Sequence, residues 1–172
     1  MTKSILRAQS RAVLGRGAVL HASAAVVIGK GVLFLAPSGG GKSTTVRILK
    51  RRGFTILGDD STIVSRGTDN IWRILPCASY EWSTGERPPP QRLHSLFLLE
   101  KGEPSLIREL TSRYTCYRIL RDDSILACGD LQTEERPRLR RTVRLLSRDF
   151  PCRLLRWSNS DSLVSTLLEN LE

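Results

Sequence analysis

The chain has 172 residues, of which 40% are hydrophobic and 26% are charged, and its formal net charge is +10. These values are ordinary for a soluble globular protein, and the length predicts a single domain over residues 1–172. They exclude a membrane span, because no apolar run approaches the roughly 18 residues that are needed to cross a bilayer.

The positive charge is unevenly distributed along the chain. Residues 1–58 contain Lys and Arg but no Asp or Glu, and Asp59 is the first acid. A basic start of this kind is also typical of a transit peptide. Residues 13–35 alternate like strands, however, so we expect a folded surface that favours polyanions such as nucleotide phosphates.

The cysteines show no pattern that would indicate a metal site. There is no C-x-x-C pair among them, and their spacings fit no metal-ligand motif. This scatter predicts free thiols in a reducing compartment, and therefore a cytoplasmic protein. The four residues are Cys77, Cys116, Cys128 and Cys152.

In chain order, the first segments are short and separated by glycines. Residues 1–10 fit a short helix or a frayed terminus, and the runs 12–20 and 24–28 have the alternation of strands. The triplet Gly29-Lys30-Gly31 is a turn signal, so we expect a hairpin between 24–28 and the apolar run 32–35.

That apolar run continues into A-P-S-G-G-G-K-S and then into the helical segment T-T-V-R-I-L-K-R-R. A strand, a glycine-rich turn, Lys-Ser and a helix are the parts of a phosphate-binding loop. Glycines let backbone N–H groups converge on one anion, while the lysine reaches phosphates and the hydroxyl can ligate Mg²⁺. A flexible glycine linker is the alternative. The expected nucleotide-binding residues are Ser38, Gly39, Gly40, Gly41, Lys42, Ser43 and Thr44.

The loop departs from the pattern G-x-x-x-x-G-K-[ST] at its first position, where Ala36 stands. Alanine accepts backbone conformations with negative φ, so we expect the loop to keep its form.

A pair of carboxylates follows the next predicted strand. The helix over 42–52 stops at Gly53, and the strand over 54–57 ends in Gly58-Asp59-Asp60. Chemistry in α/β proteins lies at the carboxyl ends of strands, and this strand should return close to the first. We therefore expect the pair to face the phosphates, although a plain Asp-rich turn has the same composition.

The rest of the chain predicts, in order, strands over 62–65 and 71–75, an irregular excursion over 78–91, a strand over 93–100, a helix over 105–120, a segment 124–128 that fits helix or strand, a helix over 131–146, a strand over 150–157 and a helix over 159–171. The arginines of the helix over 131–146 indicate a solvated face or a docking surface for an acidic partner.

The stretch H-A-S-A-A-V-V-I-G-K-G-V-L-F-L-A-P-S-G-G-G-K-S-T-T-V, followed by R-G-F-T-I-L-G-D-D, resembles the kinase domain of HPr kinase/phosphorylase. It also resembles the peptide-serine kinases of lasso-peptide pathways. The resemblance implies an α/β fold, namely a phosphoenolpyruvate carboxykinase-like P-loop domain with a mixed central sheet and flanking helices. Because members of the family assemble as hexamers, it also implies a homo-oligomer.

The resemblance further implies roles for individual residues. Lys42 would bind the β- and γ-phosphates, Ser43 and Asp60 would ligate Mg²⁺, and Asp59 would be the general base. His21 would be a catalytic residue beside the carboxylates. The division of roles between the two aspartates rests on their order alone, so the residues leave it open.

The leading hypothesis is an ATP-dependent kinase that uses Mg²⁺ to phosphorylate a hydroxyl, in particular serine, on a small protein or peptide. Arg87 and Arg92 are the cationic candidates for bridging the phosphate that such a kinase transfers. A small-molecule kinase is an alternative, with the excursion as the acceptor pocket. A third is a regulatory module that binds nucleotides or nucleic acid. Nucleic acid is disfavoured, because the aromatic residues do not interleave with the arginines.

Overall fold

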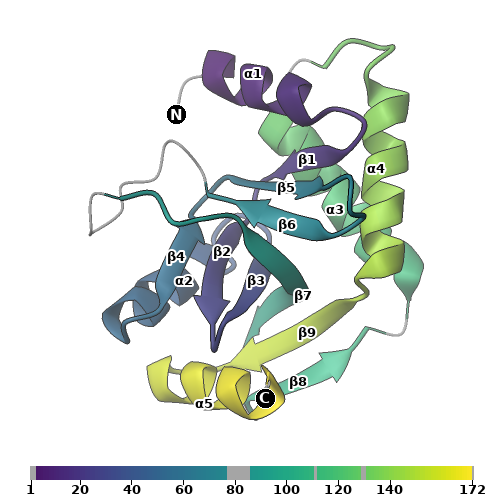
Figure 1. Ribbon diagram of the computed structural model, residues 1–172. Coiled ribbons are helices and arrows are strands. Elements are labelled where there is room, and N and C mark those ends of the chain that lie inside the picture. Colours follow the sequence, from purple (N-terminus) through teal and green to yellow (C-terminus); the bar gives the residue numbers. More distant parts are fainter. Residues whose placement is uncertain (1–2, 77–85, 111, 129–130, 172) are drawn as a thin grey trace.

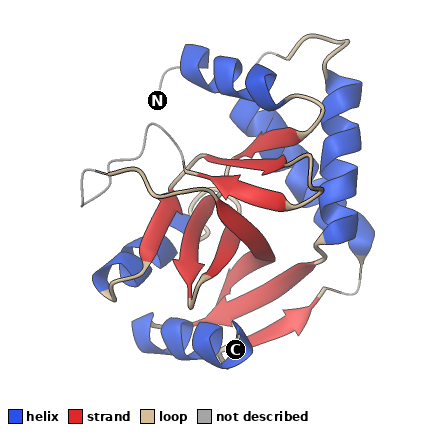
Figure 2. Ribbon diagram, viewed as in Figure 1, coloured by secondary structure: helices blue, strands red, loops and turns tan. Residues whose placement is uncertain are grey.

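The structure is a computed structural model that describes residues 3–76, 86–110, 112–128 and 131–171 (Figure 1). It has a mixed central sheet with flanking helices, as the family resemblance implies (Figure 2). The elements are α1 (Lys3–Val13), β1 (Gly17–Leu20), β2 (Ser23–Val27), β3 (Lys30–Leu35), α2 (Lys42–Arg51), β4 (Thr55–Gly58), β5 (Thr62–Arg66), β6 (Trp72–Leu75), β7 (Gln91–Lys101), β8 (Leu106–Glu109), α3 (Arg113–Cys128), α4 (Arg136–Asp149), β9 (Cys152–Trp157) and α5 (Ser160–Leu171).

Strand β7 belongs to two arms of the sheet. On one edge it pairs in parallel with β3. On the other edge it pairs first with β6, antiparallel, and then with β9, parallel. One arm therefore has the order β4-β2-β3-β7-β9-β8, and the other has the antiparallel order β1-β5-β6-β7.

The apolar run that precedes the glycine-rich loop is β3, and it is buried on both faces. Its side chains alternate between two hydrophobic clusters, Leu33 and Leu35 in one and Val32 and Phe34 in the other. A strand that is covered on both faces needs apolar residues at every position, which is why the run is continuous.

The two clusters lie on different sides of the sheet, as the grouping of helices in Figure 1 shows. Helices α2 and α5 pack against one face, where the rings of Phe34 and Phe97 stack at 6.1 Å between centroids. Helices α1, α3 and α4 pack around β1 on the other side. The loop after β3 thus stands on a fully packed support.

The hairpin predicted from Gly29-Lys30-Gly31 is confirmed. Strands β2 and β3 are antiparallel, and Ile28 and Gly29 both have positive φ, 43° and 75°. Two successive positive φ values match the tight turn that fits the twist of a hairpin. The strand pair predicted over 62–65 and 71–75 is also present, as β5 and β6.

One predicted helix is wrong in its first part. Residues 106–109 of the helix expected over 105–120 form β8, which pairs antiparallel with β9, and helix α3 begins only at Arg113. A four-residue segment with only two apolar residues has too few positions to reveal its period, so pairing with the open edge of β9 decides its conformation. Residues 124–128, which fitted helix or strand, continue α3.

The prediction of free thiols is wrong for two of the four cysteines. Cys116 and Cys152 form a disulfide, with their Cα atoms 5.4 Å apart and a sequence separation of 36. The pairing arises because α3 packs beside the start of β9, a contact that no sequence spacing reveals. The cytoplasmic location, which rested partly on free thiols, stays a prediction.

The expectations about a membrane span and about the excursion over 78–91 remain. Among the described helices, none has the length and hydrophobicity that a membrane span requires. Of the excursion expected over 78–91, residues 78–85 lie outside the described residues.

Candidate phosphate-binding site

The glycine-rich loop joins β3 to α2, and its geometry requires glycine at three positions. Gly39 and Gly41 have φ values of 76° and 98°, a region that side chains disfavour. A Cβ at Gly40 would lie 2.7 Å from the Cβ of Ala36 and 2.9 Å from the carbonyl oxygen of Pro37. The loop is therefore a compact turn, and it is closed by a hydrogen bond from Gly40 N to the carbonyl oxygen of Pro37 at 2.9 Å.

Ala36 fits the first position of this loop. Among the described residues, the only non-glycine residues with positive φ are Ile28, Asp60 and Asn70, so Ala36 has a conformation that alanine readily adopts. Its methyl group is part of the cluster beneath the loop and is 2% exposed. The residue supports the loop from below rather than disturbing it.

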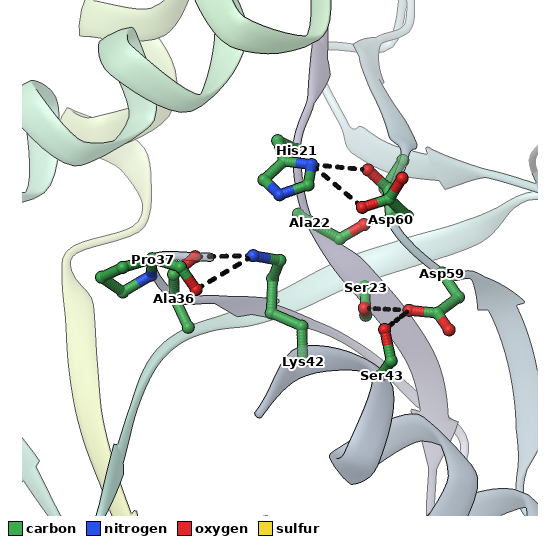
Figure 3. Close-up of polar contacts among 10 residues, drawn as sticks. His21, Ala22, Ser23, Ala36, Pro37, Lys42, Ser43, Asp59 and Asp60 are labelled. Carbon is green, nitrogen blue, oxygen red and sulfur yellow. Dashed lines mark hydrogen bonds and ion pairs between the residues drawn. The ribbon is translucent and has the colours of Figure 1, made fainter. Parts of the chain in front are cut away.

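Lys42 begins α2 and folds back over the loop. Its Nζ donates to the carbonyl oxygen of Ala36 at 2.7 Å and to that of Pro37 at 3.4 Å, as Figure 3 shows. The ammonium group and the amino end of α2 thus place positive charge at the same point. A cavity of about 250 Å³ opens there and is lined by His21, residues 38–44 and Asp60.

Asp59 lies directly after β4 and is held by two hydroxyl groups. Its Oδ1 accepts hydrogen bonds from Ser23 Oγ at 2.7 Å and from Ser43 Oγ at 3.0 Å (Figure 3). Ser23 opens β2, which lies between β3 and β4 in the sheet. The strand that carries the aspartates is therefore one strand removed from the loop strand, and its carboxylate still reaches the loop.

Asp60 differs from its neighbour in every contact. It has a φ of 66°, its side chain is 79% exposed, and His21 Nδ1 lies 3.0 Å from its carbonyl oxygen and 3.2 Å from its Oδ1. The left-handed conformation is one that Asp tolerates better than most residues. Pairing of Leu20 with Thr62 between β1 and β5 brings His21 to this corner.

The oxygen atoms near the loop fit a magnesium ion that arrives with a nucleotide. In the described part of the chain, no cluster of three or more His, Cys, Asp or Glu could hold a metal alone. The Ser43 hydroxyl and the Asp59 carboxylate are hard oxygen ligands, beside a loop that suits phosphates. Mg²⁺ is usually bound by one or two carboxylates together with phosphate oxygens and water.

Three residues near the site were not predicted. One is Ser23, which holds Asp59. The others are Lys101 and Trp157, because a Cβ at Gly41 would meet Trp157 Cζ2 at 3.3 Å and Lys101 Cε at 3.4 Å. Both end strands parallel to β3 and so lie at the sheet edge that carries the loop. Position at the carboxyl end of a strand is the signal that could have found them.

The two arginines proposed to bridge a transferred phosphate lie apart. Arg92 pairs with β6 at the start of β7, and its carbonyl oxygen faces Gly31, so it lies at the opposite end of β3 from the loop. Arg87 donates to the carbonyl oxygen of Pro76, just after β6. Because the end of β6 pairs with the start of β5, Arg87 lies toward the Asp60 end of that sheet.

The chain was compared with known proteins. No family model matches it, and no curated protein matches its sequence. Among solved structures, its fold is similar to that of the Hpr(Ser) kinase/phosphatase from Coxiella burnetii, with a TM-score of 0.52 and 14% identity over 89% of this chain and 90% of that one. At this identity the likeness supports a relationship of fold alone, so the chemistry must be argued from the site.

Proposed function

We propose that the protein is an ATP-dependent kinase that phosphorylates a hydroxyl group, in particular serine, on a small protein or peptide. The observation that carries the proposal is the arrangement around the loop. His21 and Asp60 line the cavity beside the loop together with residues 38–44, and Ser43 of the loop is hydrogen-bonded to Asp59. A phosphate site next to a metal-ligand pair and an exposed carboxylate is what transfer to a hydroxyl needs.

The glycine-rich loop would hold the phosphates of ATP. Its backbone N–H groups, the amino end of α2 and the Lys42 ammonium group would neutralise their charge. Ser38 and Thr44 line the same cavity and are the remaining hydroxyl donors. A bound Mg²⁺ ion, held by Ser43 and Asp59, would supply further neutralisation of the phosphate charge.

The contacts of the two aspartates favour the reverse of the roles that their order suggested. Asp59 already accepts two hydrogen bonds beside the metal-ligand hydroxyl of Ser43, which favours the metal side. Asp60 lines the cavity and is exposed, so an acceptor hydroxyl can approach it. A general base must reach the proton that it removes, and this favours Asp60 as the base.

In this mechanism Asp60 accepts the proton of the acceptor hydroxyl while the hydroxyl oxygen attacks the γ-phosphorus of ATP. The bond from the γ-phosphorus to the bridging oxygen breaks, which leaves ADP and a phosphate ester. His21 is a positioning residue, because its Nδ1 contacts both the carbonyl and the carboxylate of Asp60. These contacts hold the left-handed corner that directs the carboxylate toward the cavity.

Serine is favoured as the acceptor because the similar structure is named a kinase/phosphatase of Hpr(Ser). The test is transfer from γ-labelled ATP, with Mg²⁺, to serine-containing proteins and peptides on one side and to hydroxyl metabolites on the other. Label should appear in the polypeptide acceptors, and Lys42→Ala should abolish it. Arg51→Ala, at the exposed far end of α2, is the control and should retain it.

Two results would contradict the proposal. Transfer to metabolites alone would make the protein a small-molecule kinase. Nucleotide binding without transfer to any hydroxyl would make it a regulatory module.

A further inference from the structure

A second cavity, of about 220 Å³, lies at the opposite end of β1 and β5 from His21 and Asp60. It is bounded by the residues before β1, by the turn between β5 and β6, and by one side of α4. The residues that matter to its chemistry are Arg16, Arg66, Asn70, Trp72, Thr142 and Leu145.

The cavity has an apolar wall and an excess of positive charge. Trp72 is 3% exposed, and its Nε1 donates to Asp149 Oδ2 at 2.9 Å. Arg148 Nη2 also donates to Asp149, at 2.9 Å, and Arg66 Nη2 lies 4.0 Å from it. Burial opposes ionisation of Asp149, but these donors and charges outweigh it and lower its pKa. Asp149 is therefore already paired with Trp72, Arg148 and Arg66. The carboxylate of Asp69, in the turn between β5 and β6, is likewise paired with Arg73, at 2.6 Å.

Helix α4 adds further arginines to the rim. Arg138 and Arg141 stand one turn before Thr142 and Leu145, which line the cavity, so they lie on the same flank of the helix. Both are exposed, as is Arg16, and the side chains of these three form no hydrogen bond or ion pair with any described residue. Between residues 136 and 148 the sequence contains no acid.

We propose that this basic cavity and the adjoining flank of α4 dock an acidic segment of the protein that receives the phosphate. The identity of that partner rests on the proposed function, but the binding of acidic peptide does not. Guanidinium groups pair with carboxylates through two parallel hydrogen bonds, which suits Asp and Glu side chains.

A peptide explains the layout better than a single small anion does. Arg16 lies before β1, whereas Arg138 and Arg141 lie on α4, so the arginines come from two elements and do not converge on one point as a site for a single small anion would. The apolar wall offers burial to a side chain next to the acids. Nucleic acid is disfavoured because Trp72, the aromatic residue of the cavity, is buried and cannot stack on a base.

The strands set the distance between docking and transfer. Arg16 precedes β1 and His21 follows it, five positions apart, which is about 17 Å at the rise of a strand. An extended peptide of about five residues covers that distance. The acidic residues of the acceptor should therefore lie about five positions from its phosphorylated hydroxyl.

The test is binding of a fluorescein-labelled peptide that carries four glutamates placed five residues from a serine, measured by fluorescence anisotropy. Arg16→Glu and Arg141→Glu should each weaken binding by about tenfold, the loss expected for one charged hydrogen-bonded contact. Arg51→Glu, the same charge change on the exposed end of α2, should leave the affinity unchanged. A peptide with four alanines should not bind.

Affinity for a fluorescent ATP analogue is measured on the same variants, so the two proposals can fail separately. If the wild type does not bind the ATP analogue, the proposed function is overturned and the docking result is unaffected. Equal peptide binding by the wild type, Arg16→Glu and Arg141→Glu would overturn the docking site. The docking site would also be overturned if the protein bound random duplex DNA more tightly than the peptide and if Arg16→Glu and Arg141→Glu weakened that binding.

Discussion

Strands β1 and β5 connect two polar ends of the molecule that are held in different ways. At the proposed nucleotide end, which carries the glycine-rich loop, backbone conformation places the groups: Gly39, Gly41 and Asp60 all have positive φ, and the Asp60 carboxylate is exposed. At the basic end, which carries the second cavity, side-chain hydrogen bonds place the polar groups: Trp72 is buried and donates to Asp149.

The difference indicates which property each end controls. An exposed carboxylate on a fixed backbone contributes little to packing, so its loss should affect the chemistry and leave stability nearly unchanged. A buried indole that is bonded to a carboxylate contributes to packing and to polar satisfaction, so its loss should affect stability and leave the nucleotide cavity intact.

The largest expected effect is that of Asp60→Asn at the nucleotide end. If Asp60 is the base, single-turnover transfer should fall by about 10³, within the range of general base catalysis. The melting temperature should stay the same, because the side chain is 79% exposed. Asp161→Asn is the matched control, since Asp161 is 76% exposed and paired with Arg52. Transfer at the wild-type rate in Asp60→Asn would remove Asp60 as the base.

Ser43→Ala should have the next largest effect. It removes the hydroxyl that donates to Asp59 and that would ligate Mg²⁺, so kcat/KM at limiting Mg²⁺ should fall by about 10- to 100-fold. Raising the Mg²⁺ concentration should restore part of the loss. Ser43→Thr keeps a hydroxyl and should behave like the wild type. An alanine variant with unchanged Mg²⁺ dependence would place the ion elsewhere.

Trp72→Phe tests the basic end. It removes the Nε1 donor of Asp149 and leaves a small void, so urea unfolding should show a loss of about 1–2 kcal/mol. Trp157→Phe is the comparison, because the buried Nε1 of Trp157 has no hydrogen-bond partner among the described residues. It should cost less. Equal losses in the two variants would show that the bond to Asp149 contributes nothing beyond packing.

The smallest effect concerns His94, which belongs to neither end. Burial, and then the charges of Lys30, Arg153 and Arg92, lower its pKa below 6.5. As the pH falls, His94 is therefore protonated in the unfolded chain before it is protonated in the folded one. The free energy of unfolding has its full value above pH 6.5 and decreases as the pH falls below 6.5. His94→Gln should flatten stability between pH 6.5 and the lower folded pKa. Solvent screening keeps this contribution to the free energy of unfolding below about 0.5 kcal/mol. If urea unfolding of His94→Gln shows the same pH dependence as the wild type, the prediction is wrong.

The nucleotide end could be predicted largely from sequence because its signals are local. The continuous apolar run of β3, the three glycines and Lys42-Ser43 follow one another, and each has one physical explanation. The two aspartates are local as well, but their surroundings are not. Ser23 and His21 reach them only through the pairing of β2 with β4 and of β1 with β5. The family resemblance implied the place of His21 beside the carboxylates, whereas nothing in the sequence indicated that of Ser23.

The basic end could be predicted only in part. The arginines of α4 indicated a docking surface for an acidic partner as one alternative, but the cavity itself is assembled from three distant segments. The arginines before β1, after β5 and along α4 meet only when α4 packs beside β1. The same holds for the disulfide, which joins α3 to β9, and for β8, whose conformation is set by the edge of β9. Patterns within a segment do not report the neighbours that folding brings to it.

Because β7 is covered by β3 on one edge and by β6 and then β9 on the other, both arms of the sheet must separate before its amides meet water. In hydrogen–deuterium exchange, amides in the middle of β7 should therefore be among the slowest, exchanging only on global unfolding. Those of β1, at the end of the antiparallel arm, can exchange through local opening. The glycine-rich loop is thus anchored, through β3, to the part of the sheet whose hydrogen bonds should break last on unfolding.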